Sequence, residues 1–305
     1  MRLAAIDIGS NAARLLIKDI TTYVDGSLDF TKVNLIRVPL RLGFDVFESG
    51  IISDSKIQQL VETIQAFKHF LNIYEVQAIK VCATSAMRDA KNSNEILQQV
   101  LNETDIEINV ISGSEEAQIL YETHLADNLD AKFNYLYIDV GGGSTELTLY
   151  TVAKEVVKKS FNIGTIRLIK DSVDDETWDD MKLFIKSDIK IHTPIQAIGS
   201  GGNINKIFSL SKKKIGKPIS AEILKEYYTE MNALTVNERI HKYGFREDRA
   251  DVIVPALRIY NNILRWTGIT EIYVPQIGLA DGLIRQLYNE MRFTSLMGLQ
   301  KPGGA

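Results

Sequence analysis

The chain has 305 residues, of which 45% are apolar and 24% are charged. That length predicts about two domains, and the apolar fraction is large enough for both to bury a core. The 35 basic and 39 acidic side chains give a net charge of -4, which excludes a general nucleic-acid binder, so any polyanion site must be local.

The sequence contains no evident signal for export or membrane insertion. Asp7 interrupts the first apolar run, and no stretch of about 18 uncharged apolar residues occurs. We therefore expect a cytoplasmic protein whose partners include neither a membrane nor a nucleic acid. Base rates among soluble oligomers favour a homodimer.

The first predicted element is a β-hairpin. Strand-forming residues run from Leu3 to Ile17 and are interrupted at residues 7–11, with the sequence Asp-Ile-Gly-Ser-Asn. Gly, Ser and Asn in such a turn allow positive φ and a close approach to an anion, so that amide groups and a hydroxyl can bind it. We therefore predict phosphate contacts at Gly9, Ser10 and Asn11.

Helical and strand patterns alternate after this hairpin. Apolar residues recur at helical spacing from Ser55 to Leu71, with Ser53 or Asp54 as the N-cap. Further along we predict a strand over Val76–Ala83, a helix over Asn94–Leu101 and a strand over Ile106–Ile111. This alternation indicates an α/β layer structure with a largely parallel component.

Cysteine and histidine provide no catalytic or metal signature. Cys82, the single cysteine, lies in an apolar stretch and is expected to be a small buried residue. The four histidines are scattered without paired metal-ligand spacing, and no G-x-S-x-G elbow is present. Neither a zinc site nor a Ser-His-Asp hydrolase is therefore expected.

A helix is predicted to begin directly after Ser112. Ser112 and Glu115 have the spacing of a capping box, which gives Glu115 a structural role. Glu116 has two alternatives: it is a first-turn acid favoured by the helix dipole, or it is a general base beside a phosphate cleft.

A second hairpin repeats the pattern of the first. The strand-forming run from Tyr135 to Tyr150 is interrupted by the turn between Asp139 and Glu146, whose small residues predict phosphate contacts at Gly141, Gly142, Gly143 and Ser144. Both hairpins place an acid at a strand end. Two carboxylates from different halves would then meet over a metal ion and a phosphate chain, which indicates a duplicated core with a cleft between its halves.

A third glycine-rich turn follows a strand that begins near Ile195. The turn at residues 199–202 has the sequence Gly-Ser-Gly-Gly and opens toward a predicted helix from Ile204 to Leu210, an arrangement that suits anion binding around Gly201. Four lysines at positions 212, 213, 214 and 217 then form either a solvated loop or a contact for the distal part of a long anion.

Five segments together resemble the exopolyphosphatase and guanosine pentaphosphate phosphatase family, within the actin-like ATPase superfamily. Their order and spacing match over nearly the whole chain. They are Ala5–Asn11, Ala83–Arg88, Val110–Ala117, Asp139–Leu147 and Gly199–Gly202.

The resemblance implies an α/β fold of two actin-like (ribonuclease H-like) domains flanking a phosphate-binding cleft. The first domain would span residues 1–123 and the second residues 124–305, with a C-terminal helix over about Asp281–Met291 packing back on the first. The tail from Gly298 to Ala305 is expected to be frayed.

The resemblance also implies roles for individual residues. Glu116 matches the family's catalytic glutamate, and Arg88 matches an arginine that faces substrate phosphates. Asp139 and Glu146 match acids near Mg²⁺ or another divalent cation, and Asp7 is expected close by.

The implied function is that of an exopolyphosphatase, which hydrolyses the terminal phosphate of inorganic polyphosphate and releases orthophosphate. The alternative is hydrolysis of the 5′ phosphate of guanosine pentaphosphate (pppGpp). A kinase of the same superfamily and a non-catalytic alarmone sensor are weaker alternatives, because an acceptor pocket is not evident and the acidic constellation is complete.

Overall fold

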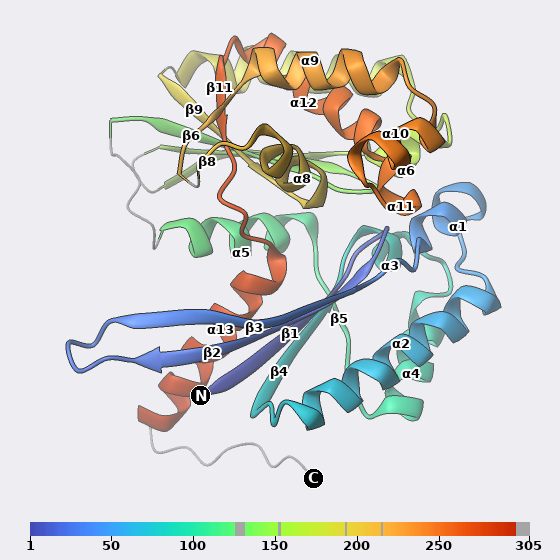
Figure 1. Cartoon of the computed structure of the whole chain (residues 1–305), viewed down its shortest axis with the longest axis vertical. Coiled ribbons are helices and arrows are strands. Elements are labelled where there is room, and N and C mark those ends of the chain that lie inside the picture. The colour runs from blue at the N-terminus through green and yellow to red at the C-terminus, as the bar shows by residue number, and fades with distance from the viewer. Residues whose placement is uncertain (126–131, 152–153, 193, 215, 297–305) are drawn as a thin grey trace.

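The computed structural model describes residues 1–125, 132–151, 154–192, 194–214 and 216–296 (Figure 1). Each half of the chain builds one mixed β-sheet, and helices cover the sheets. The tail expected to be frayed lies outside the described residues. None of the helices within these ranges is both long enough and apolar enough to cross a bilayer.

The N-terminal half forms a five-stranded sheet in the order β3-β2-β1-β4-β5. Its strands pair antiparallel from β3 to β1 and parallel from β1 to β5. The elements in chain order are β1 (Arg2–Ile8), β2 (Ala13–Thr22), β3 (Leu28–Val38), α1 (Leu42–Ser49), α2 (Asp54–Ile73), β4 (Ala78–Ala83), α3 (Ser85–Asp89), α4 (Ser93–Thr104) and β5 (Asn109–Val110).

The predictions for this half are confirmed, with one difference. The first hairpin, the helix α2 after its N-cap Ser53, the strand β4 and the helix α4 all form where the sequence predicts them. The strand expected over Ile106–Ile111 is reduced to β5. Ile106 and Ile108 are buried in the core beside the helices, so their apolar character reflects packing rather than strand pairing.

The C-terminal half forms a six-stranded sheet in the order β10-β11-β9-β6-β7-β8. Its helices and strands, in chain order, are α5 (Gly113–Leu125), β6 (Asn134–Val140), β7 (Thr145–Thr151), β8 (Lys154–Phe161), α6 (Thr165–Ile169), α7 (Asp175–Phe184), a π-helical turn (Ile185–Ile189), a 3-10 turn (Lys190–His192), β9 (Ile195–Ser200), α8 (Gly202–Ser211), β10 (Ile219–Ser220), α9 (Ala221–Asn232), α10 (Val236–Tyr243), α11 (Glu247–Ala250), α12 (Ile253–Thr267), β11 (Glu271–Tyr273) and α13 (Leu279–Leu296).

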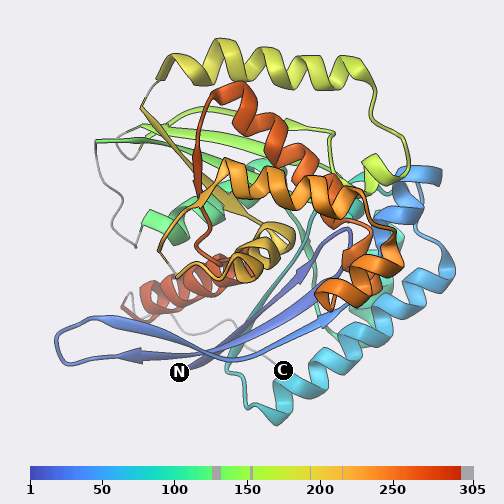
Figure 2. The same cartoon turned by 45° about the horizontal axis from the view of Figure 1, so that its top comes forward.

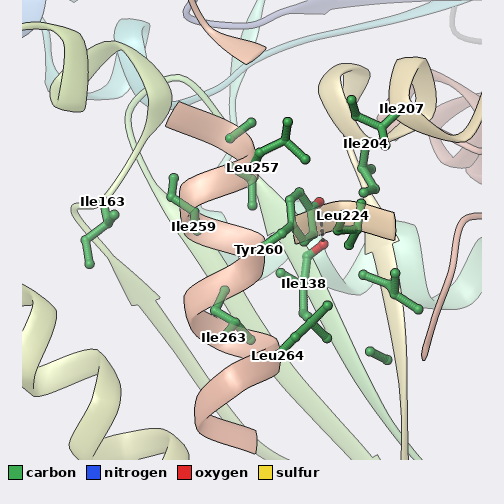
Figure 3. Packing of buried hydrophobic residues seen from close by; sticks show 14 of the residues in the cluster. Ile138, Ile163, Ile204, Ile207, Leu224, Leu257, Ile259, Tyr260, Ile263 and Leu264 are labelled. Carbon is green, nitrogen blue, oxygen red and sulfur yellow. Dashed lines mark hydrogen bonds between the residues drawn. The ribbon is translucent and has the colours of Figure 1, made fainter. Parts of the chain in front are cut away.

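Helix α12 provides much of the core of this second half. Its buried side chains include Leu257, Tyr260 and Leu264, which lie against residues of the sheet such as Ile138 (Figure 3). Because successive residues of a strand point to opposite faces, Ile138 faces α12 whereas Asp139 faces the other side.

Two helices bridge the halves. Helix α13 follows β11 of the second sheet, yet it packs beside the strands of the first, as both views show (Figures 1 and 2). Helix α5 follows β5 of the first sheet, yet it contacts β6, β7 and β8 of the second. The two helices also pack on each other at Gly282, where a Cβ atom would collide with Ile119. Because each of these helices packs on the sheet of the other half, the start of α5 lies at the ends of β6 and β7.

Candidate active site

A cleft of about 620 Å³ lies between the two sheets. Most of the site residues predicted from the sequence line it, and all three glycine-rich turns contribute. The predicted residues that line it are Asp7, Gly9, Ser10, Asn11, Glu116, Asp139, Gly141, Gly142, Ser144, Glu146 and Gly201. Arg88 and Gly143 do not belong to this lining.

In the first hairpin, Asp7 is the last residue but one of β1 and faces Arg14 on β2. The two residues are registered opposite each other, and Arg14 Nη1 donates to Asp7 Oδ2 at 2.7 Å. Asp7 is almost fully buried. A charge-assisted hydrogen bond of this kind compensates the buried carboxylate.

In the second hairpin, Asp139 on β6 is registered opposite Glu146 on β7. Hydroxyl groups rather than cations hold both carboxylates. Ser200 Oγ donates to Asp139 Oδ1 at 2.7 Å, and Ser144 and Ser160 donate to Glu146 Oε1 at 2.6 and 2.9 Å. Both side chains are therefore fixed in direction by neutral donors, and within the described residues neither carboxylate forms an ion pair.

Glu116 lies in the first turn of α5. The predicted capping box is confirmed: the Glu115 amide donates to Ser112 Oγ at 3.1 Å, and the Ser112 amide donates to Glu115 Oε2 at 2.8 Å. This cap leaves the neighbouring Glu116 free to face the cleft, which it lines together with Asp139 and Glu146.

The acids of the cleft shift one another's pKa values. Burial is the largest cause that raises the pKa of Glu116 well above its ordinary value, and the charge of Asp139 is the next. Burial, followed by Asp139, also raises the pKa of Glu146 to about 7. Burial raises the pKa of Asp139 itself, although the hydrogen bond from Ser200 opposes this rise. A cation placed among these groups would favour their ionised forms.

Arg88 lies on α3, close to the acids but off the wall of the cleft. Its Nη1 donates to the Ile111 carbonyl at 3.1 Å, and its Nε lies 3.8 Å from the Asp89 carboxylate. Its positive charge opposes the rise that burial causes in the pKa values of Glu116 and Glu146. Arg88 is thus within electrostatic range of both acids.

Gly142 and Gly143 of the second hairpin turn serve close packing rather than positive φ. Among the predicted phosphate-loop glycines only Gly201, with φ 107°, is left-handed, so the sequence-based expectation of positive φ is wrong for the hairpin turns. A Cβ atom on Gly142 would lie 2.8 Å from Ser10 Cβ, and one on Gly143 would collide with the Phe47 ring. The turns of the two halves therefore meet directly.

A group of cations that was not predicted from the sequence also lines the cleft, and we call it the basic cluster. Its members are Lys32, Arg14, Arg37, Lys206, Arg246 and Arg249. Burial, followed by the charges of Arg37 and Arg14, lowers the pKa of Arg249 to about 10. Arg249 Nη1 donates to the Gly202 carbonyl, so this guanidinium lies at the third glycine turn.

Only one member of the basic cluster carried a usable sequence signal. Arg14 could have been found by counting the register of the first hairpin, which places it opposite Asp7. Arg37 lies on β3, whereas Arg246 is the N-cap of α11 and Arg249 lies within that helix, more than half the chain away. The fold alone brings these distant segments together.

The acids of the cleft suit a metal ion that is bound partly by the protein and partly by the substrate. Within the described ranges, no three His, Cys, Asp or Glu side chains converge into a ready-made cage. Mg²⁺ needs none, because proteins commonly hold it through one or two carboxylates together with water and substrate phosphates. The opposed pair Asp139 and Glu146 fits this mode, whereas one oxygen of Asp7 is engaged by Arg14.

Comparison with known proteins gives one consistent family. The sequence model of the Ppx/GppA phosphatase family matches residues 20–291. Exopolyphosphatase 1 of Mycobacterium tuberculosis is 24% identical over 318 residues, which cover 97% of this chain and 91% of that protein. The bifunctional 3-dehydroquinate synthase/phosphatase of Fusobacterium nucleatum is 32% identical over 168 residues, but these cover 54% of this chain and only 25% of that protein.

Solved structures agree with the family match. The crystal structure of the Aquifex aeolicus Ppx/GppA family member is similar with a TM-score of 0.74 and 25% identity, covering 95% of this chain and 98% of that one. The α/β class and the two actin-like domains predicted from the sequence are thereby confirmed.

Proposed function

The chain belongs to the Ppx/GppA phosphatase family, and on that premise we propose that it removes the terminal phosphate of inorganic polyphosphate and releases orthophosphate. It is a phosphatase, a hydrolytic enzyme. One observation carries the choice of substrate: an acidic group and the basic cluster share one cleft and meet at the pair Asp7 and Arg14. A chain of phosphates could bind a cation at one end and arginines along its length.

Most cations of the basic cluster have no carboxylate partner among the described residues, which supports the binding of a long anion. Arg14 and Arg37 have carboxylate partners in Asp7 and Asp248, at 2.7 and 2.5 Å. In the described part of the chain, the other members make no ion pair: Lys32, Lys206, Arg246 and Arg249. Buried or clustered cations without counter-charges are costly, and a polyanion would supply those charges.

The lining of the cleft favours polyphosphate over guanosine pentaphosphate. A guanine base would require a flat apolar surface for stacking, in addition to polar groups at its edge. Phe245 is the sole aromatic residue among the described residues of the cleft, and only 4% of its surface is exposed. Guanosine pentaphosphate remains the alternative substrate in the experiment below.

We place a divalent cation, Mg²⁺ or a close substitute, at Asp139 and Glu146, with Asp7 nearby. When bound, such an ion would neutralise charge on the terminal phosphates. The residues of the chain would then do the positioning. Amide groups around Gly9–Asn11 and Gly141–Ser144, and the amides near Gly201, would orient the phosphates.

We assign Glu116 as the general base. Burial, followed by the charge of Asp139, raises its pKa well above the ordinary value, which makes the ionised carboxylate a stronger base. In the proposed step a water oxygen attacks the terminal phosphorus in line, its proton passes to Glu116, and the bond to the bridging oxygen breaks. Arg88 would offset negative charge on the transferring phosphoryl group and the shortened chain.

Two further proposals concern the whole chain. We place the domain boundary at residues 123 and 124, in the last turn of α5, the helix that leaves the first sheet and packs against the second. We also propose a cytoplasmic location, since polyphosphate and nucleotide substrates of this kind are accessible there.

The proposed function is tested by measuring orthophosphate release from long polyphosphate, tripolyphosphate and guanosine pentaphosphate with Mg²⁺. Glu116→Gln serves as the blank. A positioned general base contributes about 10²–10⁴ in rate, so this variant should lose activity on that scale while circular dichroism shows an unchanged fold. Preference for pentaphosphate would select the alternative substrate. Release no greater than the blank for every substrate would refute hydrolysis and favour the kinase or the sensor.

A further inference from the structure

Tyr260 is buried behind the candidate site, not in it. It lies in the middle of α12 with 1% of its surface exposed, and it does not line the cleft. Its hydroxyl donates to the Ser200 carbonyl at 2.6 Å. The Ile138 carbonyl lies 3.2 Å from the same oxygen (Figure 3). A tyrosine in an apolar core requires a hydrogen-bond partner for its hydroxyl. Here the partners are backbone carbonyls of the two strands that lead to the candidate site.

The two carbonyls belong to the ends of the strands that carry the site. Strands β6 and β9 pair in parallel, and Asp139 opposite Ser200 is their last registered pair. Beyond Ser200 the backbone turns away at Gly201, whose φ is 107°. Carbonyl groups at such an end lose their ladder partners, and a buried carbonyl without a donor is unfavourable. Tyr260 supplies that donor where the two strands part.

Ser200 continues the chain of contacts into the cleft. Its backbone carbonyl accepts from Tyr260, and its side-chain Oγ donates to Asp139 Oδ1 at 2.7 Å. After burial, the charge of Asp139 is the next cause that raises the pKa of Tyr260, which reflects how near the two groups lie. One residue therefore connects the phenol of α12 to the carboxylate of β6.

We propose that Tyr260 is a positioning residue for Asp139 and acts through Ser200. This inference rests on the role given to Asp139 in the proposed function, where it helps to hold the divalent cation. Anchoring the end of β9 fixes the Ser200 hydroxyl, and that hydroxyl fixes the direction of the Asp139 carboxylate. Groups that orient a metal-binding side chain in this way typically contribute about 10–100-fold to metal affinity or activity.

A purely structural role for Tyr260 makes a different prediction. Tyr228, on α9, packs against the same core but has no hydrogen bond to the strand ends. If both tyrosines only fill space, removing either hydroxyl should leave metal dependence unchanged. If Tyr260 acts on Asp139, removing the Tyr260 hydroxyl should change the metal dependence, whereas removing the Tyr228 hydroxyl should not.

The test compares Tyr260→Phe, Ser200→Ala and the double variant with Tyr228→Phe as the matched control. For each protein we would measure kcat, KM for polyphosphate and the Mg²⁺ concentration that gives half-maximal activity. We expect Tyr260→Phe and Ser200→Ala each to raise that Mg²⁺ concentration about tenfold or more, with KM at saturating Mg²⁺ changed by less than about twofold. The double variant should be no worse than the more impaired single variant, because both changes act through one carboxylate.

Several results would overturn the inference. Unchanged Mg²⁺ dependence in Tyr260→Phe would do so, as would multiplicative losses in the double variant or an equal loss in Tyr228→Phe. A crystal structure of Tyr260→Phe decides the matter independently of activity, since Ser200 should have moved away from Asp139. If the wild-type protein releases no orthophosphate, the proposed function fails, yet an undisturbed contact between Ser200 and Asp139 in that crystal would still refute the positioning role by itself.

Discussion

The two hairpins that face each other across the cleft have the same backbone arrangement, but they differ in the charge of the residue that lies opposite the acid. In the first, the acid at the strand end is registered opposite a base, Asp7 with Arg14, and they form an ion pair of 2.7 Å. In the second, the acid at the strand end is registered opposite another acid, Asp139 with Glu146. Like charges directly opposite each other destabilise a pair of strands.

This difference divides the work of the site. The first hairpin neutralises its own acid, and Arg14 continues into the basic cluster with Arg37 and Arg249. The second hairpin retains two acids whose pKa values are raised by burial and then by neighbouring charge, as Glu146 illustrates at about 7. In the proposed function, the first half would receive an anion and the second half a cation, which is what a metal-bound phosphate chain presents.

Among changes to the two hairpins, the largest effect should come from removing one of the opposed acids. Glu146→Gln keeps the shape and its hydrogen-bonding oxygen but halves the local negative charge of the pair. If the proposed metal binds there, we expect turnover to fall about 10²–10³-fold, because such an ion contributes several kcal/mol to stabilising the transition state. Glu103→Gln, on the exposed face of α4, is the control. Retention of near-normal turnover in Glu146→Gln would show that the second hairpin is not the cation half.

The sequence predicted both hairpins and their acids because each depends on local pattern. Period-2 strands, a terminal aspartate and small turn residues are all visible within about fifteen positions of one another. Glu116 could be separated from Glu115 in the same way, since the capping box with Ser112 gives the first of them a structural role.

What could not be predicted depends on distant segments meeting. Arg249 reaches the cleft because α11 lies over the turn that ends at Gly202, and no local pattern near Arg249 indicates that contact. Phe47 explains why position 143 is glycine, although the two residues are far apart in the chain. Contacts of this kind follow from the arrangement of the sheets and not from periodicity.

Arg14→Ala tests the first hairpin and should have the next largest effect. The change leaves Asp7 buried without its partner and removes one cation from the cleft. A hydrogen bond to a charged group is worth about 1.5–3 kcal/mol, so KM for polyphosphate should rise about tenfold or more, and kcat should change much less. Steady-state kinetics measure this split. A fall in kcat with unchanged KM would instead assign Arg14 to the chemical step.

A smaller effect is expected in the pH dependence of stability. The pKa of Glu146 rises from 4.5 in the unfolded chain to about 7 in the folded protein. Between these values the folded state binds the extra proton, so this group's contribution makes stability fall as pH rises, and the fall ends near pH 7. Thermal unfolding of metal-free protein should therefore show a larger loss of Tm between pH 5 and pH 8 in wild type than in Glu146→Gln. Parallel curves for the two proteins would contradict the raised pKa.

The smallest predicted effect concerns what holds the two hairpins face to face. Arg41, at the start of α1, pairs with Asp251 beside α11 at 2.5 Å, and this contact joins the two halves at a position outside the lining of the cleft.

Asp251→Asn should therefore weaken the alignment of the halves without touching the substrate. Both partners are partly exposed, so the pair is worth about 1 kcal/mol or less, which corresponds to at most a fivefold rise in KM for polyphosphate. Asp19→Asn is the matched control, because Asp19 pairs with Arg2 at 2.8 Å entirely within the first half. Only a pair that joins the two halves can alter how the hairpins face each other, so the control should leave KM unchanged. Equal effects from the two variants would show that the Arg41 pair contributes to local stability alone.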